Sequence, residues 1–519
     1  MIKKWRWSMM VLLGLLVFSI IMVIKPVPVA AAETNRVLLV YDSKNTVAHG
    51  EKKIDALQRI LTSMNLSVKT VKASNYHAGE LNATYTGVIT MVNWRQAGLK
   101  NTQFETDRAH FTGIKLHIGD CLTGTEAKDL QGKIKVLNEQ QLILKNGNDQ
   151  QLLPFSDHLE VLDQLPANAI KVGQLTSQQT DQKTYDYGVI VGKNAYLPYL
   201  KTRGLSLLVA EQTITQLFGQ TQQYQPLLTF TDVSPYANLK VLDQLSEYCY
   251  KRKIPFAIST TTVADNTDLQ AFAQFTAFLR RIEKRNGVIF VQTPVIGGAT
   301  QSDGQKLSEM FTSYLVSFSR YQVYPVGISA PGYWNQDQVL RRNSLAKANH
   351  WLLLPNTDVT YLKQDDKSQV ANQSFMAVSA ASLTTIQNQS QIKFNVPTAV
   401  TVSVPSSMKK IHIVEREISG LGFQWFNFSQ SKTSTEIKSG TTTVNYRQGK
   451  YYVNGSAEPI TMSDQAHTKE PVQPKTKVLF KSFFKTQGQI IGVFFGIVFI
   501  VLLIFILIGR RIYRNMFKR

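Results

Sequence analysis

The stretch PLLTFTDVSPYANLKVLDQL, residues 226–245, joins an apolar run to a helical pattern through Thr231-Asp232-Val233-Ser234-Pro235. An apolar run of this kind is typical of a strand buried on both faces of a parallel sheet. In barrels built from such strands, the functional side chains follow the carboxyl ends of the strands. Asp232 occupies that position, so its function depends on the side chains that the neighbouring strands supply.

The same alternation of strand and helix continues to residue 365. Apolar strands are centred on LLTFTD (227–232), PFAISTT (255–261), GVIFVQT (287–293), YPVGISA (324–330) and HWLLLP (350–355). Four amphipathic segments separate these five strands. The alternation predicts a parallel (β/α) barrel over residues 226–365.

Residues 33–225 predict a doubly wound α/β domain with a β-rich insertion. RVLLVYD (36–42) is an apolar strand, KKIDALQRILTSM (52–64) is an amphipathic helix, and TGVITMVNW (86–94) is a further strand. Within the insertion, Asn146-Gly147 predicts a hairpin turn. Asp42, at the end of the first strand, has two interpretations: a ligand-binding residue at the switch point of the sheet, or a residue that caps the loop.

The region that follows the barrel changes character. Short segments such as NVPTAVTVSV, KKIHIV and TTVNYR are separated by turn residues, which predicts a β-sandwich-like domain over residues 366–460. Residues 461–488 contain prolines among charged and polar residues, which is typical of a stalk. The predicted fold class is therefore α/β, with several domains.

Both ends of the chain carry apolar segments. Residues 1–32 place three basic residues before an apolar run that closes on three alanines, which indicates a cleaved signal peptide or an uncleaved anchor. Residues 489–509 contain an uncharged run of membrane-spanning length, followed by a basic tail at 510–519. The positive-inside rule then predicts a single-pass membrane protein with an extracellular large domain and a cytoplasmic C-terminus.

The amino-acid composition narrows the chemical classes of partner. The formal net charge is +21, and without the basic residues of the two ends it is +12. A surface this basic favours polyanions such as an acidic wall polymer, although a merely soluble, charged surface is an equal alternative. No segment resembles a nucleic-acid-binding module. The two cysteines, Cys121 and Cys249, are too few for a disulfide scaffold, and the apolar helical face around Cys249 predicts a buried thiol.

Three motifs on successive predicted strands resemble the polysaccharide-deacetylase-like proteins related to carbohydrate esterase family four, in particular a branch with a D-D-V-S-P motif. Residues 231–235 match that motif, residues 287–292 match its G-E-I-x-x-H motif, and residues 330–333, Ala-Pro-Gly-Tyr, match its A-P-H-Y motif. The resemblance covers about 110–140 residues of the chain. It implies the deacetylase-like barrel and a site at the carboxyl ends of its strands.

The residues that carry the family's chemistry are replaced. The resemblance implies a base, then an Asp and two His that hold a divalent metal, which activates water. These positions, followed by the His of the third motif, are here Thr231, Asp232, Gln292, Ile296 and Gly332. A threonine is no base at neutral pH, and one carboxylate with one neutral amide does not hold zinc. The resemblance therefore implies a degenerate, catalytically inactive member without a metal or other cofactor.

Some of these residues suit a carbohydrate ligand, which needs polar groups and a stacking surface. The candidate glycan-binding residues are Asp232, Gln292, Tyr333, Trp334 and Asn335. Asp232 has the alternative role of capping the Ser234-Pro235 turn, and Trp334 that of packing against the following helix.

Three functions remain open on the sequence alone. The first is a non-catalytic protein that binds an extracellular polysaccharide or scaffolds exopolysaccharide assembly in the cell envelope, with synthesis or export proteins as partners. The second is an active deacetylase or other hydrolase with a rearranged site. The third is an envelope sensor or adhesin.

Overall fold

The computed structural model describes residues 35–44, 49–178, 183–263, 265–296, 300–348, 351–355, 373–387 and 392–459, and helical residues between 494 and 511. The chain divides into two compact units, residues 1–462 and 463–519. The predicted signal peptide at 1–32 and the predicted stalk at 461–488 lie outside the described residues.

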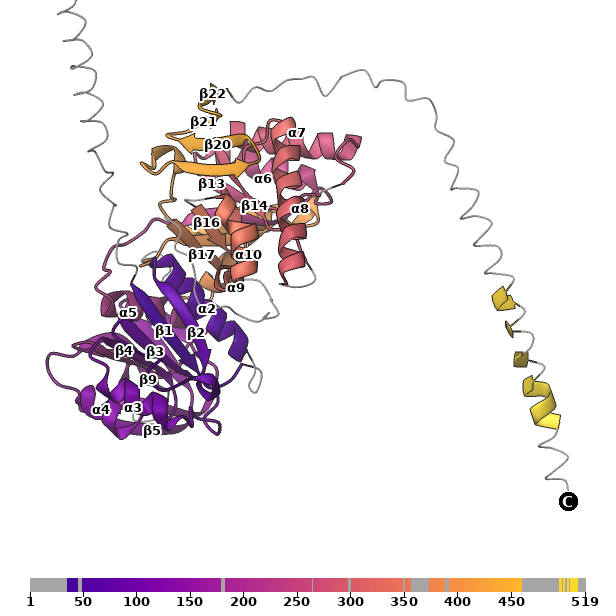
Figure 1. Ribbon diagram of the computed structural model, residues 1–519. Coiled ribbons are helices and arrows are strands. Elements are labelled where there is room, and N and C mark those ends of the chain that lie inside the picture. The colour runs from indigo at the N-terminus through magenta and orange to yellow at the C-terminus, as the bar shows by residue number, and fades with distance from the viewer. Residues whose placement is uncertain are drawn as a thin grey trace, which may run out of the picture. The chain divides into compact units, whose positions relative to one another are not determined.

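The first part of the larger unit is a nine-stranded mixed sheet, drawn in indigo to purple in Figure 1. The strand order is β2-β1-β3-β4-β11-β10-β9-β6-β7, and the strands from β2 to β11 are parallel. β5 and β8 form a separate antiparallel pair. The strands are β1 Arg36–Tyr41, β2 Ser67–Lys72, β3 Gly87–Val92, β4 Ile114–Gly119, β5 Lys133–Gln140, β6 Leu142–Asn146, β7 Asp149–Leu152, β8 Ser156–Asp163, β9 Ile170–Ser177, β10 Thr184–Val191 and β11 Asn194–Leu197.

Four helices accompany this sheet: α2 Gly50–Ser63, α3 Thr102–His110, α4 Gly124–Asp129 and α5 Leu205–Leu217. Alternate residues of β1 enter different cores, because successive side chains of a strand point to opposite faces. Val37 and Leu39 belong to the core that also contains α2 and α5, whereas Leu38 belongs to a second core that contains Phe104 of α3. The sheet is thus covered on both faces. The hairpin predicted at Asn146-Gly147 joins β6 to β7.

The second part is a closed barrel of seven parallel strands, β12 to β18, drawn in magenta to orange in Figure 1. β18 closes the barrel by pairing with β12. The strands are β12 Leu227–Val233, β13 Phe256–Thr260, β14 Gly287–Gln292, β15 Gly327–Ser329, β16 Trp351–Leu354, β17 Gln373–Ser379 and β18 Thr398–Ser403. The helices are α6 Leu239–Lys251, α7 Gln270–Lys284, α8 Gln301–Arg320, α9 Gly332–Gln336, α10 Gln338–Asn343, α11 Ala380–Leu383 and α12 Ile411–Leu421.

The β-sandwich predicted over residues 366–460 is wrong. Its first part supplies the barrel strands β17 and β18, because β18, most of whose residues are buried, pairs in parallel with β17 on one side and with β12 on the other. The segment that begins at Ile411 is the helix α12, whose buried residues Ile411, Val414 and Ile418 follow a helical spacing. The rest is one antiparallel sheet of β19 Thr435–Ser439, β20 Thr442–Arg447, β21 Lys450–Val453 and β22 Ser456–Glu458.

The membrane prediction is also contradicted. In the part of the chain that the structure describes, no helix has both the length and the apolar character needed to cross a bilayer. The predicted transmembrane helix at 489–509, and with it the single-pass localisation with an extracellular large domain and a cytoplasmic C-terminus, is therefore wrong.

The nine-stranded sheet and the barrel share one continuous apolar core that includes α2. Arg59 of α2 is fully buried, forms an ion pair with Asp55 at 2.8 Å between Nε and Oδ2, and donates a hydrogen bond of 3.0 Å to the carbonyl of Ala377 in β17. The helix therefore joins the two parts by polar as well as apolar contacts. Both cysteines are free, and Cys249 is fully buried, as its helical face predicts.

Candidate functional site

The residues of the predicted deacetylase-like site all follow strands of the barrel. Thr231 and Asp232 lie near the end of β12, Gln292 ends β14, and Gly332 begins α9 just after β15. Because the strands are parallel, these positions belong to one mouth of the barrel. They fall, however, into three separate sets of contacts.

The first set surrounds Asp232. The pairing of β12 with β13 shifts between Phe230 and Val233, and Asp232 has a left-handed φ of 60°. This irregularity leaves the Asp232 side chain exposed. Its Oδ2 accepts a long hydrogen bond of 3.4 Å from the Thr231 hydroxyl, which lies 3.5 Å from the hydroxyl of Ser403. Asp232 is thus a solvated carboxylate beside two hydroxyl groups.

The second set surrounds Gln292, at a position where the family resemblance implies a metal-binding His. Its Nε2 donates a hydrogen bond of 2.9 Å to the hydroxyl of Ser259, which in turn donates one of 2.8 Å to the hydroxyl of Ser329. Both serines are buried. Ile296, at the second such position, is half-buried against the apolar core. The Gln292 amide is therefore part of a hydrogen-bonded chain that needs no ion.

The third set covers Gly332. A Cβ atom at this position would lie 2.9 Å from Asp55 Oδ1 and 2.9 Å from Arg59 Cγ. Burial raises the pKa of Asp55, and the adjacent Arg59 guanidinium opposes this shift. A histidine at position 332 would clash with this ion pair. The helix α2 thus covers the mouth beside β15.

The aromatic residues proposed for glycan stacking point elsewhere. Trp334 is 4 % exposed and packs in the apolar core, and Asn335 is 2 % exposed. Tyr333 is half-buried, with its ring centroid 6.4 Å from that of Trp334. This geometry matches the packing role considered for Trp334, and it leaves little aromatic surface at the mouth.

Asp42 caps its loop, as one of its two interpretations expects. Its Oδ1 accepts a hydrogen bond of 2.7 Å from the backbone N–H of Asn93, and its Oδ2 accepts one of 2.9 Å from that of Trp94. The hydroxyl of Ser43 donates a further bond of 3.0 Å to Oδ2. The carboxylate therefore ties the end of β1 to the end of β3.

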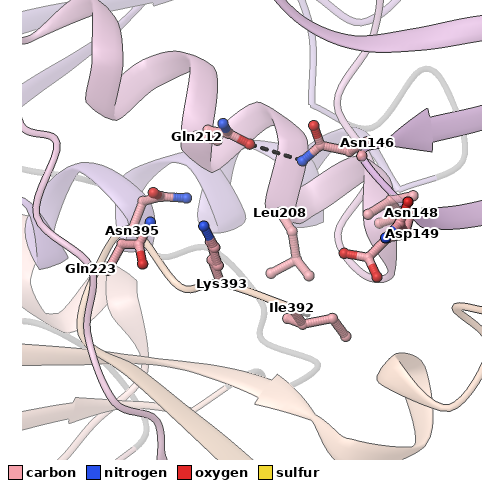
Figure 2. A pocket seen from close by; sticks show the side chains of 11 residues that line it. Asn146, Asn148, Asp149, Leu208, Gln212, Gln223, Ile392, Lys393 and Asn395 are labelled. Carbon is pink, nitrogen blue, oxygen red and sulfur yellow. Dashed lines mark hydrogen bonds between the residues drawn. The ribbon is translucent and has the colours of Figure 1, made fainter. Parts of the chain in front are cut away.

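A pocket that the sequence did not indicate lies beside the β6–β7 hairpin (Figure 2). It has a volume of about 240 Å³. Five amide side chains line it, together with one carboxylate, one ammonium group and three aliphatic side chains: Asn146, Asn148, Gln212, Gln223, Asn395, Asp149, Lys393, Leu205, Leu208 and Ile392. In Figure 2, Leu208 and Ile392 lie between Lys393 and Asp149.

The polar groups of this pocket are held in place. Asn146 Nδ2 donates a hydrogen bond of 2.9 Å to Gln212 Oε1 of α5, drawn as a dashed line in Figure 2. Asp149 is 7 % exposed, burial raises its pKa, and its Oδ1 has no hydrogen-bond partner among the described residues. A buried carboxylate oxygen without a partner is costly.

Glu211 fixes the opposite wall of the pocket. Its Oε1 accepts hydrogen bonds from the backbone N–H groups of Asn395 and Val396, at 2.6 and 2.9 Å. Complete burial raises its pKa to about 8. The segment that carries Lys393 and Asn395 is therefore anchored to α5 by a carboxyl that keeps its proton at neutral pH.

Comparison with known proteins does not identify the function. No family model matches the chain, and no curated protein does. Among solved structures, a ThuA-like protein from Parabacteroides merdae has 11 % identity and a TM-score of 0.25, over 37 % of this chain and 93 % of that one. A mandelate racemase/muconate lactonizing protein from Paracoccus denitrificans, complexed with magnesium, has 8 % identity and a TM-score of 0.20, over 43 % of this chain and 72 % of that one. Similarities this weak carry no functional argument.

Proposed function

We propose that this protein binds carbohydrate through the amide-lined pocket beside the β6–β7 hairpin, and that its barrel does not catalyse metal-dependent deacetylation. The lining of the pocket is the observation that supports carbohydrate binding. Amide groups both donate and accept hydrogen bonds, which suits the hydroxyl groups of a sugar. Leu208 and Ile392 offer the apolar contact that the C–H face of a sugar ring needs.

The size of the pocket restricts the ligand. Pockets for drug-sized molecules measure roughly 300–1,000 Å³. A volume of about 240 Å³ suits a single sugar residue, or the end of a longer glycan. Asp149 would accept a hydrogen bond from a sugar hydroxyl, and Lys393 across the pocket would favour a sugar that carries an acidic group. This agrees with the polyanionic partners that the basic composition favours.

The contacts at the barrel mouth argue against metal-dependent deacetylation. Gln292 is held by serine hydroxyls, and Gly332 is covered by the Asp55–Arg59 ion pair. Among the described residues, the one group of three metal-ligating side chains lies in the N-terminal domain rather than at this mouth. A hydrolytic metal needs several protein ligands and a base near the bound water.

Calorimetric titration of the full-length protein tests the binding. The probes are N-acetylglucosamine oligosaccharides, their deacetylated forms and uronic-acid oligosaccharides. Lys393→Met removes the ammonium group and keeps the alkyl stem, and Gln212→Ala removes one amide, so each should weaken binding. Lys409→Met is the matched control, because Lys409 is an exposed lysine that does not line the pocket.

Two results would contradict the proposal. If no probe binds, or if Lys393→Met and Lys409→Met have equal effects, the pocket is not the carbohydrate site. If acetylated hexosamine polymers release acetate and a chelator stops the release, the barrel is catalytic after all.

A further inference from the structure

Three side chains with metal-ligating atoms meet in the N-terminal domain, and none of them belongs to the barrel or lines the amide-lined pocket. They are Asp120, His158 and Glu160, and their ligand atoms lie within 4.8 Å of one another. Asp120 directly follows β4, while His158 and Glu160 are two residues apart on β8. Because side chains alternate along a strand, His158 and Glu160 share one face of β8.

The histidine is oriented toward the carboxylates. Its Nε2 lies 3.9 Å from Asp120 Oδ1 and 3.9 Å from Glu160 Oε1. This nitrogen is buried and has no hydrogen-bond partner among the described residues. Both distances are too long for a hydrogen bond, and both are close to the separation of two ligands on one metal ion. A buried nitrogen with no partner, between two carboxylates, leaves space for a cation.

The electrostatics of the group favour a cation too. Two carboxylates at this separation repel each other, and a divalent ion between them would remove the repulsion.

The group also borders an open space. Asp120 and His158 line a pocket of about 140 Å³, together with Tyr199 and Lys201. Such a pocket would let a metal ion enter and would hold water or an anion at its open coordination position. Lys201 would face that additional ligand.

We propose that Asp120, His158 and Glu160 bind a divalent first-row transition-metal ion, with Nε2 of His158 and one oxygen of each carboxylate as ligands. One imidazole and two carboxylates favour zinc or manganese over magnesium or calcium, which prefer oxygen ligands alone. Three protein ligands leave a position for water, as in catalytic rather than structural zinc sites. The side chains need to approach one another by less than about 1 Å to reach metal–ligand distances near 2.1 Å.

Binding requires one rearrangement, at Nδ1 of His158. Arg95 Nη1 now lies 2.7 Å from Nδ1, which makes Nδ1 the hydrogen-bond acceptor, and Asn138 Oδ1 lies 3.3 Å away. A metal on Nε2 needs the proton on Nδ1, where Asn138 would accept it. Arg95 is exposed and can turn toward solvent. Arg95 is thus a competitor of the metal, and Asn138 is a positioning residue.

The test is calorimetric titration of untagged, chelator-treated full-length protein with Zn²⁺ and with Mn²⁺. One site per chain is expected. Asp120→Asn and Glu160→Gln should each weaken it by more than about tenfold. Arg95→Gln should bind the metal at least as tightly as the natural chain. Asp157→Asn is the matched control, because Asp157 is an exposed acidic residue on the same strand, next to His158.

Thermal unfolding separates a ligand role from a structural one. Without metal, Glu160→Gln should unfold close to the temperature of the natural chain, and added Zn²⁺ should raise that temperature only when Glu160 is present. The proposal is overturned if neither ion binds stoichiometrically, or if Asp157→Asn weakens binding as much as Glu160→Gln. Equal Zn²⁺ affinity in the natural chain and in Asp120→Asn would overturn it as well.

Discussion

Replacing Arg59 by methionine should destabilise the protein strongly, because the substitution leaves Asp55 as a buried carboxylate without its partner. The Arg59 side chain is 0 % exposed and that of Asp55 is 11 % exposed, with 2.8 Å between the paired atoms. Removing one member of such a pair costs about 3–5 kcal/mol of unfolding free energy. This range includes the cost of losing the hydrogen bond to the Ala377 carbonyl. Methionine fills most of the volume of the arginine side chain, so a cavity adds little to the cost.

Urea unfolding followed by tryptophan fluorescence measures this loss. The double variant Asp55→Leu/Arg59→Met should recover most of it, because replacing both members of a buried ion pair by apolar residues is often neutral. Lys251→Met is the matched control: Lys251 and Glu247 form an ion pair of the same i,i+4 spacing, at 2.7 Å, but with 72 % and 43 % of their side chains exposed. No measurable change is expected there.

The loss from Arg59→Met should also depend on pH. Asp55 has an unperturbed pKa of 3.8, which burial raises. Without Arg59 the folded carboxyl would take up a proton more readily, so the destabilisation should be full near neutral pH and should shrink as the pH falls toward 4. A loss below about 1 kcal/mol, or a double variant no more stable than Arg59→Met, would refute the idea that α2 is held to the barrel by a buried ion pair.

Three further predictions concern single positions. Glu211→Gln should flatten the pH dependence of stability between pH 4.5 and about 8. Over this range the unfolded carboxyl is ionised while the folded one keeps its proton, so the stability of the natural chain falls as the pH rises. Urea midpoints measured across this range give the slope, and an unchanged slope would contradict the raised pKa. Gly332→Ala should cost about 1–3 kcal/mol of unfolding free energy, because its Cβ would approach Asp55 and Arg59 at 2.9 Å. Gly420→Ala in α12, where a Cβ would meet no atom within 4 Å, should stabilise the protein by about 0.5–1 kcal/mol. Equal effects of the two substitutions in thermal unfolding would count against the close contact. In the native protein a thiol reagent should modify Cys121 alone, since Cys249 is 0 % exposed; labelling of both cysteines at equal rates would show that α6 opens readily.

Local sequence patterns predicted the barrel better than they predicted the region that follows it. Strands such as GVIFVQ are apolar throughout and are separated by amphipathic helices, so their type and direction follow from the pattern alone. The last two barrel strands come after a long interval, and the turn residues around them suggested a sandwich. Only the pairing of β18 with β12 assigns them to the barrel, and pairing between strands some 170 residues apart is not a local property.

The candidate sites were less predictable for the same reason. The amide-lined pocket combines residues 146–149 with residues 392–395, and no pattern in either segment indicates the other. For the metal-ligating group, the two-residue spacing of His158 and Glu160 on a strand was a usable indication. The position of Asp120 depends on the turn after β4, where Gly119 and Cys121 have φ values of 104° and 65°. Left-handed backbone at a cysteine is not visible in the sequence.

The position of α2 has a consequence for anything that approaches the barrel. An enzyme that acts along a polymer needs an open path across the mouth, so that the chain can lie on both sides of the reacting bond. Here Asp55 and Arg59 stand against Gly332 on one side, and Asp232 and Ser403 lie on β12 and β18. The N-terminal domain thus acts as a permanent, covalently linked cover over the β15 side of the mouth. A glycan chain could therefore not lie across the mouth on that side.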